Sequence, residues 1–136
     1  MKKYIKCLLI AGVMLVSACG DSEFDRRAAK YGFNTEEERT FLCFGIGMYN
    51  DEINIRLTAA AMGIAYSRYL QVQKTGKDSG NLTQEHSALQ TKGTAAWEKM
   101  TPEDIKYLSE NCEGVIKNIA PKISTQLQDT MGRLGL

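Results

Sequence analysis

The sequence lacks most of the residues and spacings on which enzymes and nucleic-acid-binding proteins depend. It holds a single histidine, His86. The 17 basic residues nearly balance the 16 acidic ones and are scattered, so no basic cluster is present to neutralise phosphates. Spacings typical of haem attachment, zinc ligation, a P-loop or a nucleophile elbow are also missing. We expect no nucleic-acid partner, no cofactor and no metal site.

Assembled catalytic groups are equally scarce. A serine follows His86, but adjacent residues on a helix point to different faces, and no orienting carboxylate is identifiable. We therefore expect His86 to be either satisfied by hydrogen bonds or solvent-facing. The pair Asp51-Glu52 suits a solvated face or a break between helices, and Glu103-Asp104 suits a helix N-terminus. The sequence predicts no enzymatic activity.

Two further patterns have ordinary structural explanations. Gly45-Ile46-Gly47 begins like a dinucleotide-binding loop, but no strand precedes it, and it is typical of close helix packing. The methionines are dispersed, so filling of core gaps is a better explanation for them than copper ligation. Beyond the N-terminal segment, the methionines are Met48, Met62, Met100 and Met131.

No apolar run near the N-terminus reaches the ~20 residues that a membrane-spanning helix needs. The apolar run Cys7–Val16 follows three lysines at positions 2, 3 and 6. A positive start and a short apolar core are typical of a secretory signal peptide, whose core has ~7–15 residues. We expect residues 1–18 to be a signal peptide.

The end of this run, Val16-Ser17-Ala18-Cys19, resembles the lipobox of bacterial lipoproteins. The resemblance implies cleavage before Cys19, acylation of Cys19 by chains such as palmitate, and a membrane anchor. Residues 19–34 would then be the lipidated N-terminus and tether. Gly20, where retained inner-membrane lipoproteins carry aspartate, favours the outer membrane facing the periplasm. The alternative is an ordinary secretory signal that contains a cysteine.

Two cysteines, Cys43 and Cys112, remain beyond the signal and the acylation site. An even pair in an oxidising compartment is normally bridged, so we expect a disulfide between them. A reactive thiol or a metal ligand is the alternative. A thiol nucleophile needs an adjacent base, and the sequence does not place His86 there.

Apolar residues recur with helical spacing from residue 35 onward. Thr35 and Glu38 have the spacing of a capping box. The helix pattern behind them runs to about Gln73, although Asn50-Asp51 could break it and cap a second helix. The apolar face of this pattern consists of Leu42, Ile46, Tyr49, Ile53, Leu57, Ala60 and Ile64.

Further helices are predicted after a polar loop over residues 74–81. One begins near Thr83, and another begins at Thr101-Pro102, where threonine caps and proline takes the first helical position. Pro121 kinks or ends that helix, and a shorter C-terminal one follows. No stretch alternates as a half-buried strand does. Residues 35–136 should form an all-α domain, a small bundle of three to five helices fastened by one disulfide.

Two function classes remain open for this domain. The first is a protein-interaction module, either an accessory subunit of an envelope assembly or an immunity-type factor. The second is a helical bundle that binds a small apolar ligand or a lipid. Tyr66, Tyr69 and Tyr107 fall off or at the edge of the apolar faces, so some of them could form an exposed aromatic contact surface.

Overall fold

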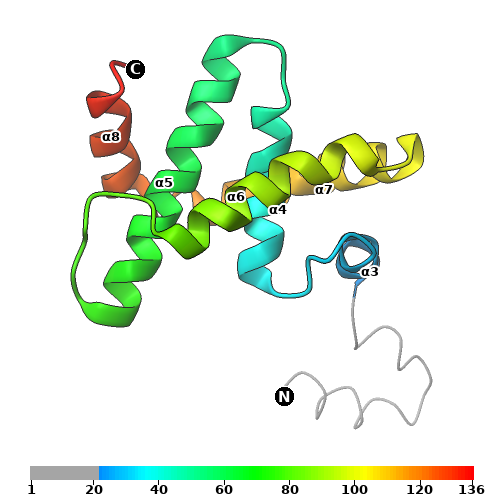
Figure 1. Cartoon of the computed structure of the whole chain (residues 1–136), viewed down its shortest axis with the longest axis horizontal. Coiled ribbons are helices and arrows are strands. Elements are labelled where there is room, and N and C mark those ends of the chain that lie inside the picture. The colour runs from blue at the N-terminus through cyan, green and yellow to red at the C-terminus, as the bar shows by residue number, and fades with distance from the viewer. Residues whose placement is uncertain (1–21) are drawn as a thin grey trace, which may run out of the picture.

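The computed structural model describes residues 22–136, which fold into six α-helices and one 3-10 turn, with no strand among them (Figure 1). This confirms the all-α class, but the helix count is six and not three to five. The helices are α3 (Glu23–Ala29), α4 (Glu36–Met48), α5 (Ile53–Thr75), α6 (Gln84–Ala96), α7 (Pro102–Ile119) and α8 (Ser124–Arg133), with the 3-10 turn η1 at Trp97–Lys99.

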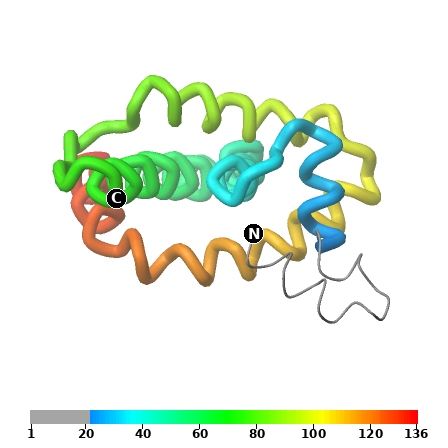
Figure 2. The backbone as a smooth tube through the Cα atoms, turned by 90° about the horizontal axis from the view of Figure 1, so that it is seen from below, coloured from blue at the N-terminus to red at the C-terminus, as the bar shows by residue number. Residues whose placement is uncertain are grey.

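The α4–α5 hairpin forms the middle layer of the domain. Figure 2 shows α6 along one side of this hairpin and α7 along the other, with α3 and α8 at opposite ends. Helix α4 contacts α5, α6 and α7, whereas α8 packs on α5 and α3 packs on α7. Because α4 touches all three long neighbours, its buried residues form the centre of the core.

The helices begin where the sequence carries capping residues. Thr35 and Glu38 form the predicted capping box at α4, with Glu38 N–H donating to Thr35 Oγ1 at 3.0 Å. Thr101 caps α7, and Pro102 occupies its first turn. Between α4 and α5, Asn50 Oδ1 accepts from the N–H of Glu52 at 2.8 Å, so the predicted break at this position is real.

Helix α3, which the sequence did not predict, lies within residues 19–34, the segment expected to be a tether. Ser22 caps it by accepting from the Asp25 N–H at 3.1 Å. Ala28 and Phe33 have no exposed surface and belong to the core cluster around the disulfide. The folded domain therefore includes residues 23–34 and is not confined to Thr35 and the residues that follow it. The segment is rich in charged residues, so its composition did not indicate that Ala28 and Phe33 are buried or that Ser22 caps a helix.

A buried carboxylate on α7 holds α3 in place. Asp104, whose side chain is 2% exposed, accepts from Lys30 Nζ at 2.8 Å and from Arg27 Nη1 at 2.9 Å. The Tyr31 hydroxyl donates to Asp104 Oδ2, the oxygen that also accepts from Lys30. These hydrogen bonds, with that of Lys30 the largest cause, lower the pKa of Asp104 from 3.8 to about 2.

We expect Asp104→Asn to lower the free energy of unfolding by about 2 kcal/mol at pH 7, because the charged hydrogen bonds to α3 are weakened. The folded pKa of Asp104 lies below its usual value, so its contribution is complete above pH 3.8 and is lost as the pH falls towards about 2. Urea titrations of both proteins across this window should show the stability difference shrinking. Glu110→Gln, which removes an exposed carboxylate of α7, should follow the wild type. A difference independent of pH would contradict this role.

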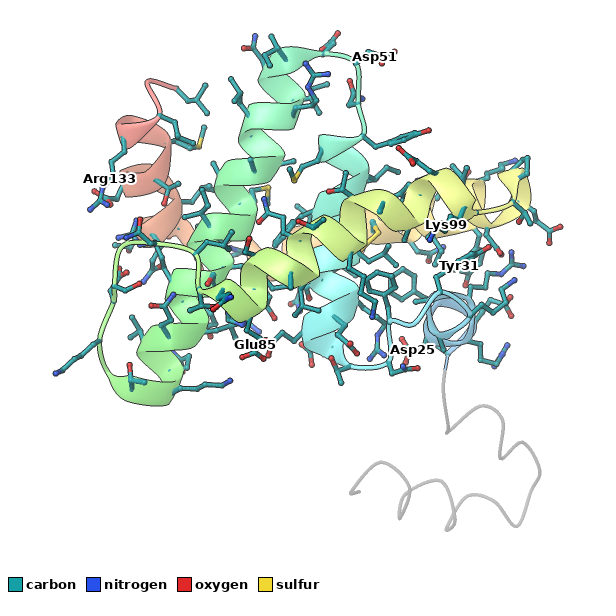
Figure 3. All side chains as sticks on the ribbon, viewed as in Figure 1. Asp25, Tyr31, Asp51, Glu85, Lys99 and Arg133 are labelled. Carbon is teal, nitrogen blue, oxygen red and sulfur yellow. A yellow bond between two sulfur atoms is a disulfide. The ribbon has the colours of Figure 1, made fainter. Side chains whose placement is uncertain are left out.

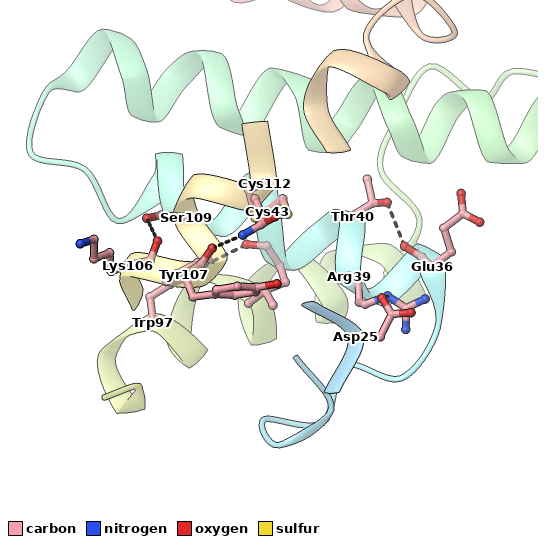
Figure 4. The surroundings of a disulfide bond; sticks show 12 residues. Asp25, Glu36, Arg39, Thr40, Cys43, Trp97, Lys106, Tyr107, Ser109 and Cys112 are labelled. Carbon is pink, nitrogen blue, oxygen red and sulfur yellow. Dashed lines mark hydrogen bonds and ion pairs between the residues drawn. A yellow bond between two sulfur atoms is a disulfide. The ribbon is translucent and has the colours of Figure 1, made fainter. Parts of the chain in front are cut away.

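The disulfide joins the middle layer to α7. Cys43 of α4 is bonded to Cys112 of α7, with 5.3 Å between their Cα atoms (Figure 4). Nearby, Trp97 Nε1–H donates to the buried Leu42 carbonyl at 2.9 Å. The predicted Cys43–Cys112 pairing is confirmed, and it fastens α7 to the α4–α5 hairpin.

On the opposite side of α4, glycines allow α6 to approach its backbone. A Cβ built on Gly45 would lie 2.5 Å from the Gly93 carbonyl carbon, and one on Gly93 would lie 2.6 Å from the Phe41 oxygen. Neither position accepts a side chain without moving a helix. Gly45 therefore allows close helix packing, as predicted for the Gly45-Ile46-Gly47 segment.

Candidate functional site

An apolar groove lies where the α4–α5 hairpin meets α7. Its volume is about 330 Å³, its walls are mostly carbon atoms, and it is open to solvent. A volume of this size lies at the lower end of the range for ligand and anchor pockets. Its principal lining residues, which define the apolar groove below, are Phe44, Ile46 and Gly47 of α4, Ile55 and Met62 of α5, and Ile116 of α7.

The floor of the apolar groove is closed. A Cβ built on Gly47 would lie 2.7 Å from the Ala59 Cβ, so α4 and α5 are in direct contact there. Phe44 is 1% exposed and packs into the core cluster with Phe41 and Tyr66. The groove is thus a surface feature over a filled core and does not lead into an internal cavity.

Large apolar side chains surround the turn at this end of the hairpin, whose position Asp51 marks in Figure 3. Ile53 is 55% exposed, Tyr49 is 51% exposed, and Ile55, which also lines the groove, is 41% exposed. The sequence pattern placed Tyr49 and Ile53 on a buried helix face, and this was wrong. The break at Asn50 turns the chain, so the two residues no longer share one face.

None of the three tyrosines considered for an exposed contact surface is fully exposed. Tyr66 is 5% exposed and contacts the rings of Phe41 and Phe44. Burial is the largest cause of the raised pKa of its hydroxyl. Tyr69 and Tyr107 are partly buried. Within residues 22–136, the aromatic ring most available for contact is therefore that of Tyr49.

A larger hollow, of about 540 Å³, lies between α3, α4 and α7, but its lining is mixed. Arg39 and Asp25, which both line it, form an ion pair at 3.1 Å. Its side chains thus satisfy one another across the hollow. The apolar groove, in contrast, leaves its lining without a covering element.

His86 is buried and hydrogen-bonded through both ring nitrogens, which confirms one of its two expected states. Its Nδ1 lies 2.7 Å from Ser67 Oγ, and its Nε2 lies 2.7 Å from Glu37 Oε1. Ser67 is completely buried, and its Oγ also accepts from the Thr83 N–H at 3.2 Å. A Ser–His–Glu chain of this kind has the members of a hydrolytic triad, but no substrate reaches Ser67 Oγ. It links α4, α5 and α6.

Arg68 is a buried charged residue that also has a structural role. It binds Asp78 with two hydrogen bonds of 2.8 Å, and Asp129 and Thr130 of α8 with bonds of 2.8 and 2.9 Å. The Arg68 guanidinium lowers the pKa of Asp78 below its usual value. Through these bonds Arg68 fixes both the α5–α6 loop and α8 on α5.

Of the methionines considered from the sequence, Met62 lines the apolar groove, while Met48 and Met100 lie elsewhere. Met48 Sδ accepts a hydrogen bond from Gln90, whereas Met100 belongs to the buried cluster around the disulfide. The methionines thus remain dispersed, as expected. The proposed acylation site, Cys19, lies outside residues 22–136, so the structure describes neither it nor the signal segment.

Comparison with protein-family models, with curated proteins and with solved structures finds no match for this chain. Across residues 22–136, no helix is both long enough and apolar enough to span a membrane. The features of this chain that bear on its function are therefore the apolar groove and the N-terminal sequence pattern.

Proposed function

We propose that this chain is a lipid-anchored protein of the bacterial cell envelope whose helical domain binds a protein partner through the apolar groove. The lipobox-like Val16-Ser17-Ala18-Cys19 supports the anchor, and Gly20 supports an outer-membrane location facing the periplasm. In this proposal the chain acts without catalysis, as an accessory subunit of an envelope assembly or as an immunity-type factor.

The observation that carries the binding proposal is an apolar groove that stays open beside exposed isoleucines. Ile53 and Ile55 present large aliphatic side chains to water next to the turn, although the core of the domain is filled. Burial of such a side chain by a partner contributes about 1.5–3 kcal/mol. Contiguous exposed apolar surface of this kind is typical of protein-interaction sites.

The position of the groove relative to the proposed anchor also favours a protein partner. Only three residues, Gly20 to Ser22, separate the acylation site Cys19 from the start of α3 at Glu23, so the chain between them reaches at most ~14 Å. Helix α3 precedes α4, and the hairpin turn lies at the far end of α4 (Figure 1). The 13 residues of α4 span about 20 Å, so the turn would point away from the anchoring membrane.

A tethered binding domain benefits from its anchor in a way that suits this arrangement. Confinement to a membrane raises the local concentration of the domain around envelope partners without adding any contact. The second function class, carriage of a small apolar ligand or lipid, is better served by an enclosed pocket. The groove is open to solvent and has a closed floor, which supports the protein partner instead.

The test is photo-cross-linking in intact cells with a benzophenone amino acid at position 53, whose side chain is exposed beside the groove. We expect a discrete adduct with one envelope protein. Adding Ile55→Glu should reduce the adduct at least about tenfold, because a carboxylate cannot be buried in an apolar groove without a large cost. The adduct is measured by immunoblotting and identified by mass spectrometry.

The matched control is Leu134→Glu, which makes the same chemical change at a residue 45% exposed near the C-terminus. It should leave the adduct unchanged, and both variants should keep the wild-type circular dichroism and unfolding temperature. An adduct equally strong in Ile55→Glu would overturn the groove as the binding site. Recovery of the monomer with a lipid or small molecule attached would favour the ligand carrier.

A further inference from the structure

A histidine and two glutamates converge at the end of the domain opposite the α4–α5 turn. Glu37 of α4, and Glu85 and His86 of α6, each offer one donor atom, and these three atoms lie within 4.8 Å of one another. The two glutamates line a hollow of about 530 Å³ between α4 and α6. Figure 3 shows Glu85 at this end, far from the turn marked by Asp51.

The imidazole of His86 is held as metal-binding histidines are held. Its ring stacks on Phe41, with 5.4 Å between the ring centres, and is 3% exposed. Ser67 Oγ holds Nδ1 at 2.7 Å, which leaves Nε2 directed at Glu37. A partner on one ring nitrogen that fixes the orientation of the other is a regular feature of metal sites. Ser67 Oγ also accepts from the Thr83 N–H at 3.2 Å and from Gln71 Nε2 at 3.3 Å. A metal on Nε2 therefore requires Ser67 to release one of these two bonds and to accept from Nδ1–H instead.

The glutamates of this cluster have few positively charged side chains near them. No hydrogen bond or ion pair of the Glu85 carboxylate is found within residues 22–136, and its side chain is exposed. Lys92, which also lines the hollow, is engaged by the Gly32 carbonyl at 2.6 Å and by Glu38 at 3.6 Å. Two carboxylates therefore lie beside one imidazole, and no described side chain pairs with the carboxylate of Glu85.

We propose that Glu37, Glu85 and His86 form a binding site for a divalent transition-metal ion of the zinc type. One imidazole nitrogen and two carboxylate oxygens suit Zn²⁺, whereas Mg²⁺ and Ca²⁺ prefer oxygen ligands alone. Water completes the coordination in the open hollow. The ion binds Nε2 of the imidazole form that carries its proton on Nδ1, where Ser67 Oγ accepts the hydrogen bond.

The geometry requires only small movements. Tetrahedral zinc with bonds of ~2.0–2.2 Å separates neighbouring donor atoms by about 3.4 Å. The Nε2–Glu37 Oε1 distance of 2.7 Å must therefore open by less than an ångström. Glu85 closes the site from the solvent side, where its exposed side chain is free to rotate. The site would tie the N-terminal turns of α4 and α6 together and so stabilise the fold.

The test uses the full chain carrying Cys7→Ser and Cys19→Ser, because the thiols of these two residues could themselves bind zinc. Zinc chloride is titrated by calorimetry, and the resonances of the single histidine are followed by NMR. We expect one zinc ion per chain, a shift of the His86 ring signals, and a raised unfolding temperature. Magnesium chloride should produce none of these effects.

Glu85→Gln is the decisive variant, because this exposed side chain can be changed without disturbing the core. We expect its zinc dissociation constant to rise at least about tenfold. Glu36→Gln removes the same charge at an exposed neighbour of Glu37 and should bind zinc as the wild type does. Equal affinity in the wild type and Glu85→Gln, or no binding at an about hundredfold excess of zinc, would overturn the site.

Discussion

Removing the Cys43–Cys112 disulfide should lower the free energy of unfolding by about 4 kcal/mol. The bridge spans 69 residues, and on the chain-entropy model a loop of that length costs the unfolded chain about this much freedom. Small domains are stable by only about 5–15 kcal/mol, so the loss is a large share of the total. Urea denaturation of the double variant Cys43→Ala/Cys112→Ala measures it, and alanine avoids placing hydroxyls in the core.

Reduction provides the control for this prediction. Both sulfurs lie in the core, with Cys43 0% and Cys112 1% exposed, so a mild reductant should act on the bridge only after the domain opens. Under strong reduction the wild type should lose most of the same stability, while the double variant should not respond. If the variant unfolds at the wild-type urea concentration, the bridge is not the main fastening between α4 and α7.

The helix boundaries could be predicted because their causes are local. Thr35, Thr83 and Thr101 each cap a helix by accepting from a backbone N–H three residues later, a spacing that is visible in the sequence. The break at Asn50 has the same short range. These signals need no knowledge of the rest of the fold, so they hold wherever the helices are packed.

Helix α3 was missed because its stability comes from distant residues. Its seven residues would be a marginal helix in isolation. It is fixed by Phe33 in the core and by Arg27 bonding Asp104, a partner 77 residues away. Nothing within the segment identifies that partner. The charged composition of this segment is typical of a tether. In the structure, however, its charged residues form the ion pairs that attach α3 to α7.

Neither candidate site could be predicted from the sequence. The apolar groove exists because α7 crosses the hairpin and leaves Ile55 uncovered, and crossing positions are set by packing. The partners of His86 come from other helices, with Ser67 19 positions and Glu37 49 positions away in the chain. The sequence offered the adjacent serine instead, which the helix turns outward. Both sites are formed by contacts between different helices, which the spacing of residues within one helix does not reveal.

A processed lipoprotein of this design should depend on Cys19 alone for its membrane attachment. One acyl chain gives only marginal binding, at ~0.8 kcal/mol per buried CH₂, and stable anchoring needs more than one chain. Among residues 22–136, no helix is apolar and long enough to replace such an anchor. The four residues from Cys19 to Ser22 carry no basic side chain that would hold the domain at an anionic surface.

We therefore expect Cys19→Ala to move the protein from the membrane fraction almost completely into the soluble fraction of the envelope. The measurement is an immunoblot of membranes after a high-salt wash, with metabolic labelling by a palmitate analogue to follow acylation. Ser22→Ala, which leaves the cleavage motif intact, is the matched control and should stay labelled and membrane-bound. Retention of Cys19→Ala on washed membranes would contradict the lipid anchor. Because the groove lies on the described domain, the released variant should still keep its fold and bind the partner, with cross-linking weakened only by the loss of local concentration.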